Sequence, residues 1–513
     1  MSQPSHEGKS KSGAGSQESG ASSYFQILRS TVLIGGSSAF AIVFAIIRNK
    51  AAAVLVGPEG FGLMSLYSAL LELSQSIASL GLQSSGVRQI AEAAGAGDME
   101  RSAVIASLLR KASLLLGVLG MGALLLLRVP VSGFTFGEHA DAVGVGLLSL
   151  AVLLRVVSGA QNALLQGTRQ IALLARANMF AAVLGTVVTV PLLYVWGIKG
   201  IVPSLVGMAA ISLMLSWVYA RRVQLPQVPL TPPDIRREAP GLMKLGLVFL
   251  VTGLLTVAAA YLIRLLVMQT HGPTAAGLYQ AAWTVGGIYA GFVLQAMGAD
   301  FYPRLSAVCN DNEACNRLVN EQAQVGMLLA GPGLLATLSW APFVIELLYS
   351  SKFHDAGVAL RWICLGMMLR IIAWPIGFII VAKNRQVILL VTEVIATATH
   401  LSLAWWLTPY FGVAGAGAAF FGLYAFHAVL VFCIVRRMSG FRWSAANIRL
   451  GLMLLPTSAG VFALTMLASF WQATAIGTLV TLVAGILCLG ALVKLLPPES
   501  LPAPIRSRLL KAA

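Results

Sequence analysis

Long apolar runs separated by short polar loops make up most of this chain. Each run can cross a hydrocarbon core of about 30 Å as a helix of roughly 20 residues. The runs are continuous, whereas the strands of a membrane barrel would alternate polar and apolar positions. Their ends, marked by Gly, Pro and charged residues, predict fourteen helices, at about residues 25–50, 60–88, 102–127, 143–167, 171–196, 200–220, 242–268, 275–302, 319–348, 357–381, 387–408, 413–435, 448–471 and 474–494.

Composition indicates that lipid surrounds these helices. Hydrophobic residues make up 58% of the chain and charged residues only 11%, whereas a soluble protein has about 25% charged residues. The chain therefore lacks the polar surface that water requires. We predict an all-α polytopic membrane protein.

The basic residues predict the orientation in the membrane. A formal net charge of +16 could suit nucleic acid, but the basic residues stand singly between apolar runs and form no groove-lining cluster, so no nucleic-acid partner is expected. Most of the 35 Lys and Arg residues fall in alternate loops, on the side of the N-terminus, and the positive-inside rule places those loops in the cytoplasm. With an even number of helices, both termini are predicted to be cytoplasmic, in a multi-pass protein of a bacterial inner membrane.

The chain contains an internal repeat. Short motifs of the first half recur in order in the second half at an offset of 215 residues, with one slip to 216, and an even number of helices in each copy makes the copies parallel. The matching motifs are Gly57-Pro58 with Gly272-Pro273, Gly62-Leu63 with Gly277-Leu278, Leu154-Arg155 with Leu369-Arg370, Arg169-Gln170-Ile171 with Arg385-Gln386-Val387 (the slip), and Arg221-Arg222 with Arg436-Arg437.

The repeat divides the chain into two lobes of six helices and an additional C-terminal helix pair. Such lobes suggest a transporter that rocks about a central cavity. The predicted segments are a disordered cytoplasmic tail (1–23), an N-lobe (24–222), a Pro-rich cytoplasmic linker (223–240), a C-lobe (241–437), and the last helix pair with a cytoplasmic tail (438–513).

Basic residues within or near the ends of the helices predict a cationic substrate-binding cavity. A charge in mid-bilayer costs about 2.5–3.5 kcal/mol on insertion scales, so it normally faces protein or water. Arg155 and Arg370 stand at equivalent positions of the repeat, and guanidinium groups bind phosphate bidentately. A snorkelling or ion-paired arginine is the structural alternative. The candidate residues are Arg48, Lys50, Arg155, Arg264, Lys352, Arg361 and Arg370.

Acidic residues within the helices are few and are candidates for ion coupling. Glu72, Glu393 and Asp300 could bind a coupling H⁺ or Na⁺, although a counter-ion role for Glu72 fits equally well. The chain shows no nucleotide-binding loop, no metal-ligand spacing and no catalytic triad order. We therefore expect no cofactor, no metal site and no enzymatic activity.

The chain resembles the Wzx polysaccharide flippases of the multidrug/oligosaccharidyl-lipid/polysaccharide exporter superfamily. Residues 50–62 (KAAAVLVGPEGFG), 302–306 (YPRLS) and above all 347–393 carry the resemblance, which extends over about 25–437 and is most similar to the enterobacterial common antigen type. That type has the same residue at Lys50, Arg264, Lys352, Phe353, Trp362, Lys383 and Glu393, and a basic residue at Arg370.

This resemblance implies transport of undecaprenyl-pyrophosphate-linked oligosaccharides from the cytoplasmic to the periplasmic leaflet. Alternating access, coupled to an ion gradient, is the implied mechanism. Membrane lipid, a polysaccharide polymerase and a chain-length regulator are the candidate partners. A multidrug exporter, a lipid II-type exporter of the same superfamily and a non-transporting assembly scaffold remain alternatives. Many Wzx-type flippases are assigned twelve helices, whereas fourteen is the number in the lipid II flippases.

Overall fold

The computed structural model describes the backbone of residues 14–226 and 228–495, in which helices predominate and no strand occurs. Side chains are described outside 14–39 and outside several positions between 289 and 303. The helices are α1 (Ala14–Ser79), α2 (Leu82–Gly95), α3 (Met99–Leu126), α4 (Arg128–Phe136), α5 (Ala142–Gly167), α6 (Ile171–Trp196), α7 (Ile201–Ala220), α8 (Pro232–Ala307), α9 (Asn312–Ser339), α10 (Ala341–Leu348), α11 (Ala356–Ala382), α12 (Gln386–Ser439), α13 (Ala445–Leu467) and α14 (Phe470–Leu495), with 3₁₀ turns η1 (Gly137–His139), η2 (Gly197–Gly200) and η3 (Ser351–Phe353).

Three of these helices are broken by a glycine. Gly57 in α1 (φ 66°, ψ −175°), Gly272 in α8 (φ 79°, ψ 179°) and Gly412 in α12 (φ 58°, ψ −135°) have backbone angles that are not helical. A Cβ atom clashes with the backbone at such positive φ angles, so these positions favour glycine. Each break separates two of the helices that the hydrophobic pattern predicts.

The prediction of a polytopic all-α membrane protein is confirmed. By length and composition, nine helical segments of the described chain could cross a membrane, or ten with the bent pair α9 and α10. Several of these segments contain two crossings, because a glycine break or η2 divides them. Two crossings lie in each of α1, α8 and α12, and one in each of α3, α5, α6, α7, α9, α11, α13 and α14, which agrees with the predicted fourteen.

The repeat is visible in the backbone at an offset of 215 residues. The breaks at Gly57 and Gly272 correspond, as do Gly197 (φ 55°) and Gly412 (φ 58°). Arg169 (φ 56°) corresponds to Asn384 (φ 54°), and α6 and α12 both begin two residues later. The sequence match at 216 is therefore displaced by one residue from the structural equivalence, and the backbone contains no insertion at that point.

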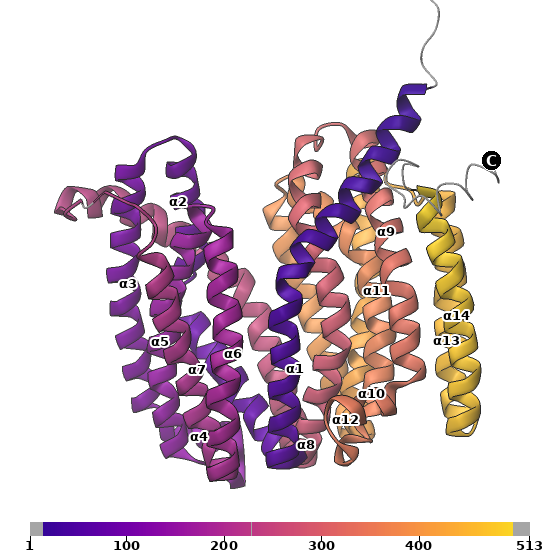
Figure 1. Ribbon diagram of the computed structural model, residues 1–513, viewed down its shortest axis with the longest axis horizontal. Helices are drawn as coiled ribbons and strands as arrows, with labels where there is room; N and C mark the ends of the chain where they lie inside the picture. Colours follow the sequence, from indigo (N-terminus) through magenta and orange to yellow (C-terminus); the bar gives the residue numbers. More distant parts are fainter. Residues whose placement is uncertain (1–13, 227, 496–513) are drawn as a thin grey trace, which may run out of the picture.

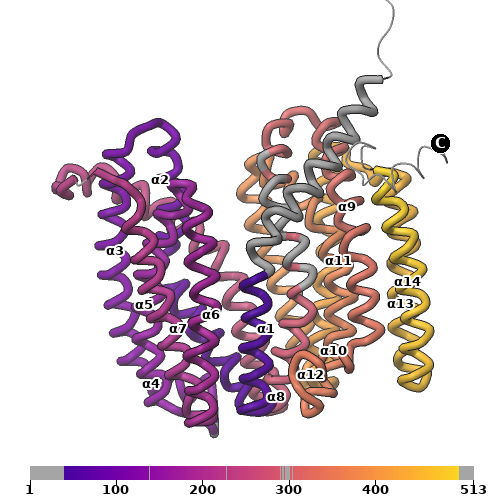
Figure 2. Tube along the Cα trace, viewed as in Figure 1, coloured from indigo at the N-terminus to yellow at the C-terminus, as the bar shows by residue number. Residues whose placement is uncertain are grey.

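Two helical lobes lie side by side, α1–α7 in one and α8–α12 in the other, and α13 and α14 stand outside the second lobe (Figure 1). The Cα trace has the same order from indigo to yellow (Figure 2). The lobes meet where α1 crosses α8. A Cβ atom at Gly62 would lie 2.0 Å from the carbonyl oxygen of Pro273, and one at Gly277 would lie 2.0 Å from that of Pro58. This reciprocal contact follows the repeat and requires glycine on both helices.

Two predicted segment boundaries differ in the structure. The helix α1 begins at Ala14, within the segment 1–23 that we expected to be disordered, and residues 1–13 lie outside the described part. The helix α8 begins at Pro232, within the predicted linker 223–240. Proline fits the first turn of a helix, where no N–H donor is required, and Thr231 and Asp234 form a capping box there.

Exposed aromatic side chains mark a lipid interface. Trp196 precedes the Gly197 turn and is 54% exposed, and the equivalent Phe411 precedes Gly412 and is 65% exposed. Trp405 and Tyr410, in the same part of α12, are also exposed. Large aromatic side chains are enriched at the boundary between lipid and water. We infer that the Gly197 and Gly412 turns lie near a membrane surface.

Candidate functional site

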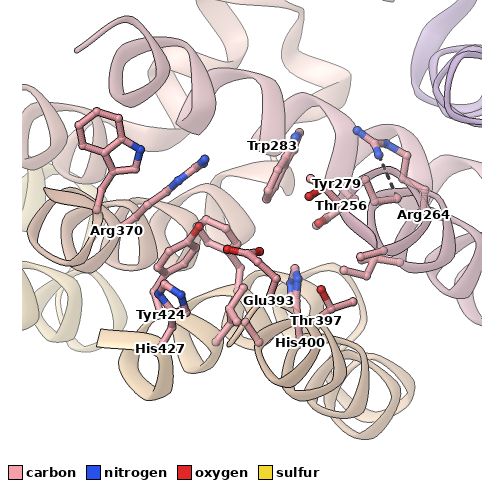
Figure 3. A pocket seen from close by; sticks show the side chains of 17 residues that line it. Thr256, Arg264, Tyr279, Trp283, Arg370, Glu393, Thr397, His400, Tyr424 and His427 are labelled. Carbon is pink, nitrogen blue, oxygen red and sulfur yellow. Dashed lines mark hydrogen bonds between the residues drawn. The ribbon is translucent and has the colours of Figure 1, made fainter. Parts of the chain in front are cut away.

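A cavity of about 380 Å³ lies inside the C-lobe, between both halves of α8, α11 and both halves of α12 (Figure 3). Apolar and aromatic side chains form most of its wall, with a few polar groups among them, as is usual for ligand pockets. The lining residues are Thr256, Ala259, Ala260, Ile263, Arg264, Tyr279, Trp283, Arg370, Trp374, Glu393, Ala396, Thr397, His400, Phe420, Leu423, Tyr424 and His427.

Two arginines lie on opposite sides of this cavity (Figure 3). The Nε of Arg264 donates to Oε1 of Gln280 at 2.7 Å, and its Nη1 donates to the carbonyl oxygen of Ala260 at 2.9 Å. Arg370 has weaker partners, the sulfur of Met367 at 3.9 Å and the ring of Tyr424 at 5.7 Å. The guanidinium of Arg370 therefore keeps most of its donors for a ligand.

The carboxylate of Glu393 lies between the two arginines in this view (Figure 3). It is partly buried and within electrostatic range of Arg370. Among the described residues, neither Glu393 nor Arg370 forms an ion pair with the other or with any other side chain. Opposite charges thus face one cavity without direct contact.

Aromatic rings form a continuous part of the wall. The ring of Phe420 is 5.0 Å from that of Trp283, with an interplanar angle of 85°, and 4.9 Å from that of Tyr424. Phe420 and Tyr279 are buried, whereas Trp283 and Tyr424 are partly exposed. The buried rings therefore support the two rings that reach the cavity.

Two histidines complete the polar part of the wall. His400 is 8% exposed, and its Nε2 is buried without a hydrogen-bond partner in the described structure. The Nδ1 of His427 is also buried without a partner. A buried polar atom without a partner costs about 1–3 kcal/mol. Both histidines line the cavity, so a bound polar ligand could supply the missing contacts.

The N-lobe holds a different set of charged residues. Arg48 and Arg155 lie within electrostatic range of each other, and Glu72 lies within range of Arg155. The Nε of Arg48 is buried without a partner in the described chain. Its Nη1 is 3.7 Å from the position that a Cβ atom on Gly185 would take. None of these residues lines the C-lobe cavity, so Arg155 and Arg370 occupy equivalent positions in separate lobes.

The remaining predicted site residues lie elsewhere. The Nζ of Lys50 donates to the carbonyl oxygen of Leu347 at 2.6 Å, which links the two lobes, and Lys352 is exposed in η3. Arg361 is buried in α11, and its Nε has no partner among the described residues. The side chain of Asp300 is outside the described residues. The structure thus brings together Arg264, Arg370 and Glu393 of the predicted set.

Sequence reasoning did not find the aromatic and histidine residues of the cavity. The repeat contained a signal for them, because the two copies differ most in chemistry at these positions. Trp283, His400 and Tyr424 correspond at the 215-residue offset to Ser68, Gly185 and Ala209. In the described chain, no group of three or more His, Cys, Asp or Glu residues is placed to hold a metal ion.

The fold is that of transporters of the MOP superfamily. A lipid II flippase MurJ in an inward closed conformation matches with a TM-score of 0.66 at 11% identity, over 90% of this chain and 99% of that one. An inward-facing multidrug resistance MATE family transporter of this superfamily matches with a TM-score of 0.65 at 16% identity, over 77% of this chain and 94% of that one. These likenesses concern the fold.

The chain belongs to the polysaccharide biosynthesis protein family, whose pattern matches residues 52–357. It is also 24% identical to a lipid III flippase of Escherichia coli over 424 residues, which cover 80% of this chain and 99% of that protein. A lipid III flippase of Shigella flexneri matches equally well. The resemblance to polysaccharide flippases is thereby confirmed, and the protein is a multi-pass membrane protein.

Proposed function

We propose that this protein is a flippase that moves undecaprenyl-pyrophosphate-linked oligosaccharide units from the cytoplasmic to the periplasmic leaflet of the inner membrane. The match to a lipid III flippase over almost its whole length carries the proposal. The transporter fold and a polar cavity inside an apolar lobe support it. The glycan would reach a polymerase and a chain-length regulator after translocation.

The arginines of the C-lobe cavity suit the anionic part of such a substrate. The lining residues include two arginines and one glutamate, so the wall has a positive formal charge. Water is largely excluded by the surrounding apolar side chains, and charge-assisted hydrogen bonds to phosphate are strong in such surroundings. Arg370 would bind the pyrophosphate, because its donors are mostly free.

Alternating access would use the contact between α1 and α8. The glycines of the crossing bring the two backbones together near Gly62 and Gly277. Phe61 adds a ring contact to the other lobe, 5.4 Å from Tyr349 and 5.8 Å from Phe353. The lobes would turn about this contact and open the pathway to one membrane face at a time.

Glu393 is the candidate for ion coupling that shares a cavity with the arginines. A proton or Na⁺ on its carboxylate would remove one negative charge from the wall and strengthen binding of an anion. Release of the ion would weaken that binding again. Glu72 stays a second candidate, since it lies near Arg155 in the N-lobe and is exposed.

A multidrug or lipid II-type exporter is the alternative within the superfamily. Cationic drugs favour a cavity with an excess of acidic residues, whereas this cavity has an excess of basic ones. The same charge would also accept the pyrophosphate of lipid II. Transport assays with both lipid-linked substrates and with a cationic drug therefore separate these activities.

The test is reconstitution of the purified protein into liposomes that contain an undecaprenyl-pyrophosphate-linked glycan. We expect the glycan to become accessible to an external glycosidase faster than in liposomes without protein. The matched variant Arg370→Gln should lower that rate while the amount of inserted protein stays the same. Translocation at the protein-free rate by correctly inserted wild-type protein would contradict the proposal.

A further inference from the structure

We propose that the C-lobe cavity is a sugar-binding site, which holds the sugar ring next to the pyrophosphate of the transported lipid. This inference rests on the proposed function and adds to it the part of the substrate that this cavity holds. It follows from the chemistry of the wall, which combines partly exposed aromatic rings with unpaired polar groups of both signs.

The charges of the wall argue against simpler ligands. A free anion in the centre of the cavity would be repelled by Glu393, and a free cation would be repelled by Arg264 and Arg370. An apolar molecule would leave Glu393, Arg370 and the Nε2 of His400 without partners. Burial of such groups without partners is costly.

Hydroxyl groups satisfy all of these side chains together. Each hydroxyl donates one hydrogen bond and accepts others. It can therefore donate to the carboxylate of Glu393 and accept from the guanidinium of Arg370, two groups that face the same cavity without an ion pair. The imidazole of His400 can donate or accept, according to its tautomer. A polyhydroxylated ring would bridge the groups that do not reach one another.

The aromatic wall suits the remaining part of a sugar. A pyranose ring has polar hydroxyls at its edge and C–H groups on its faces, and those faces pack against an aromatic ring. Trp283 projects toward the interior between Arg370 and Arg264 (Figure 3). Phe420 packs against Trp283 at nearly a right angle and limits its movement. A ring held in this way is a preorganised stacking surface.

The two lobes differ in the way that a sugar site in one lobe requires. At the 215-residue offset, the N-lobe has Ser68 in place of Trp283 and Asn178 in place of Glu393. Gly185 stands in place of His400, and Arg48 lies against it. The stacking surface and the hydroxyl acceptor therefore belong to the C-lobe alone, although the arginine at position 155 or 370 is common to both.

The experiment compares two lipids in liposomes with the full-length protein. The probes are undecaprenyl pyrophosphate and the same lipid with one N-acetylglucosamine, and the rate of flipping is measured for each. We expect Trp283→Leu to lower the ratio of the sugar-bearing to the sugar-free rate about tenfold, because the stacking surface is lost. Trp283→Phe keeps a ring and should retain most of the ratio.

The matched control is Trp405→Leu, because Trp405 is 74% exposed on α12 and does not line the cavity. This control should keep the wild-type ratio. Thermal unfolding of each variant checks that Trp283→Leu is folded, and Glu393→Gln gives a second reading of the same ratio without a change in volume. We expect a smaller reduction for Glu393→Gln, since the amide keeps one acceptor oxygen.

The possible failures are distinguishable. If wild-type protein flips neither lipid, the proposed function is wrong. If wild-type protein flips both lipids and the ratio is unchanged in folded Trp283→Leu and in Glu393→Gln, the cavity holds only water or an ion, and the sugar site is wrong while the flippase stands. A ratio that falls equally in Trp405→Leu would also overturn the sugar site.

Discussion

The N-lobe and the C-lobe share a backbone and differ in the chemistry of their interiors. Breaks at equivalent glycines and turns at Arg169 and Asn384 show that the backbone path is duplicated. The C-lobe nevertheless contains a cavity lined by aromatic, basic and acidic side chains. The difference teaches that the two copies retained the residues that direct the chain and diverged at residues that face a cavity.

Glycine explains why the backbone features were retained. At Gly57 and Gly272 the positive φ excludes residues with a Cβ atom, and at Gly62 and Gly277 any Cβ atom would clash with the other lobe. Cavity positions have no such restriction. His400 and its equivalent Gly185 both occur in regular helix, so substitution there changes chemistry without changing the fold.

The lobes also differ in how each holds the segment that follows it. In the N-lobe, Nε and Nη2 of Arg101 on α3 donate to the two oxygens of Glu238 on α8, both at 3.0 Å. In the C-lobe, Asn320 on α9 accepts from the backbone N–H of Ser444 at 2.8 Å and from Nδ2 of Asn447 at 2.9 Å. One lobe uses an ion pair and the other an amide network for the same task.

The largest expected effect comes from breaking the contact that the lobes share. Gly62→Ala should destabilise the protein by about 2–3 kcal/mol, because the backbone of α8 cannot move aside as a flexible side chain can. Gly277→Ala should act in the same way. Thermal unfolding in detergent measures the effect, and Gly122→Ala is the control, since no atom lies within 4 Å of its added Cβ. Equal stability of Gly62→Ala and Gly122→Ala would refute the reciprocal contact.

The next effect separates the two equivalent arginines. Arg370→Gln should lower the rate of flipping about 10–100-fold, which corresponds to the loss of charge-assisted hydrogen bonds. Arg155→Gln should also lower it, but less, because Arg155 does not line the C-lobe cavity. Complementation of a flippase-deficient strain and the liposome rate both measure this order. Wild-type rates for both variants would show that neither arginine contacts the substrate.

The two glutamates provide a sharper test of the difference between the lobes. Glu393→Gln should make flipping insensitive to an imposed pH or Na⁺ gradient, since the amide cannot bind and release the ion. Glu72→Gln is tested in parallel, and loss of gradient dependence there would place coupling in the N-lobe. The measurement is the liposome rate with and without each gradient. Unchanged dependence in both variants would remove both residues from ion coupling.

The smallest effect concerns the segments held by each lobe. Asn320→Ala should cost about 1–2 kcal/mol, because the backbone N–H of Ser444 and the buried Asn447 lose an acceptor. Hydrogen exchange should then increase at the start of α13 and stay unchanged at the start of α8. Arg101→Ala should give the opposite pattern. Faster exchange at both sites in either variant would mean that the two attachments are not independent.

Much of the fold could be predicted because its signals are local. Continuous apolar runs define the crossing helices, and the order of small motifs defines the repeat. The site was predicted only in part. Arg264, Arg370 and Glu393 do share a cavity, but Arg155 does not join them, and the aromatic residues were missed because a Trp or Tyr in an apolar helix looks the same whether it faces lipid, core or cavity.

The sequence by itself determined that the chain is a membrane protein of duplicated helical lobes, since hydropathy, glycine and chain order act residue by residue. Only the tertiary structure decided which polar side chains face one another. That depends on the rotation and tilt of each helix, which are set by close contacts such as the one between Gly62 and Pro273. Residues on α8, α11 and α12 that are far apart in the chain thereby line one cavity.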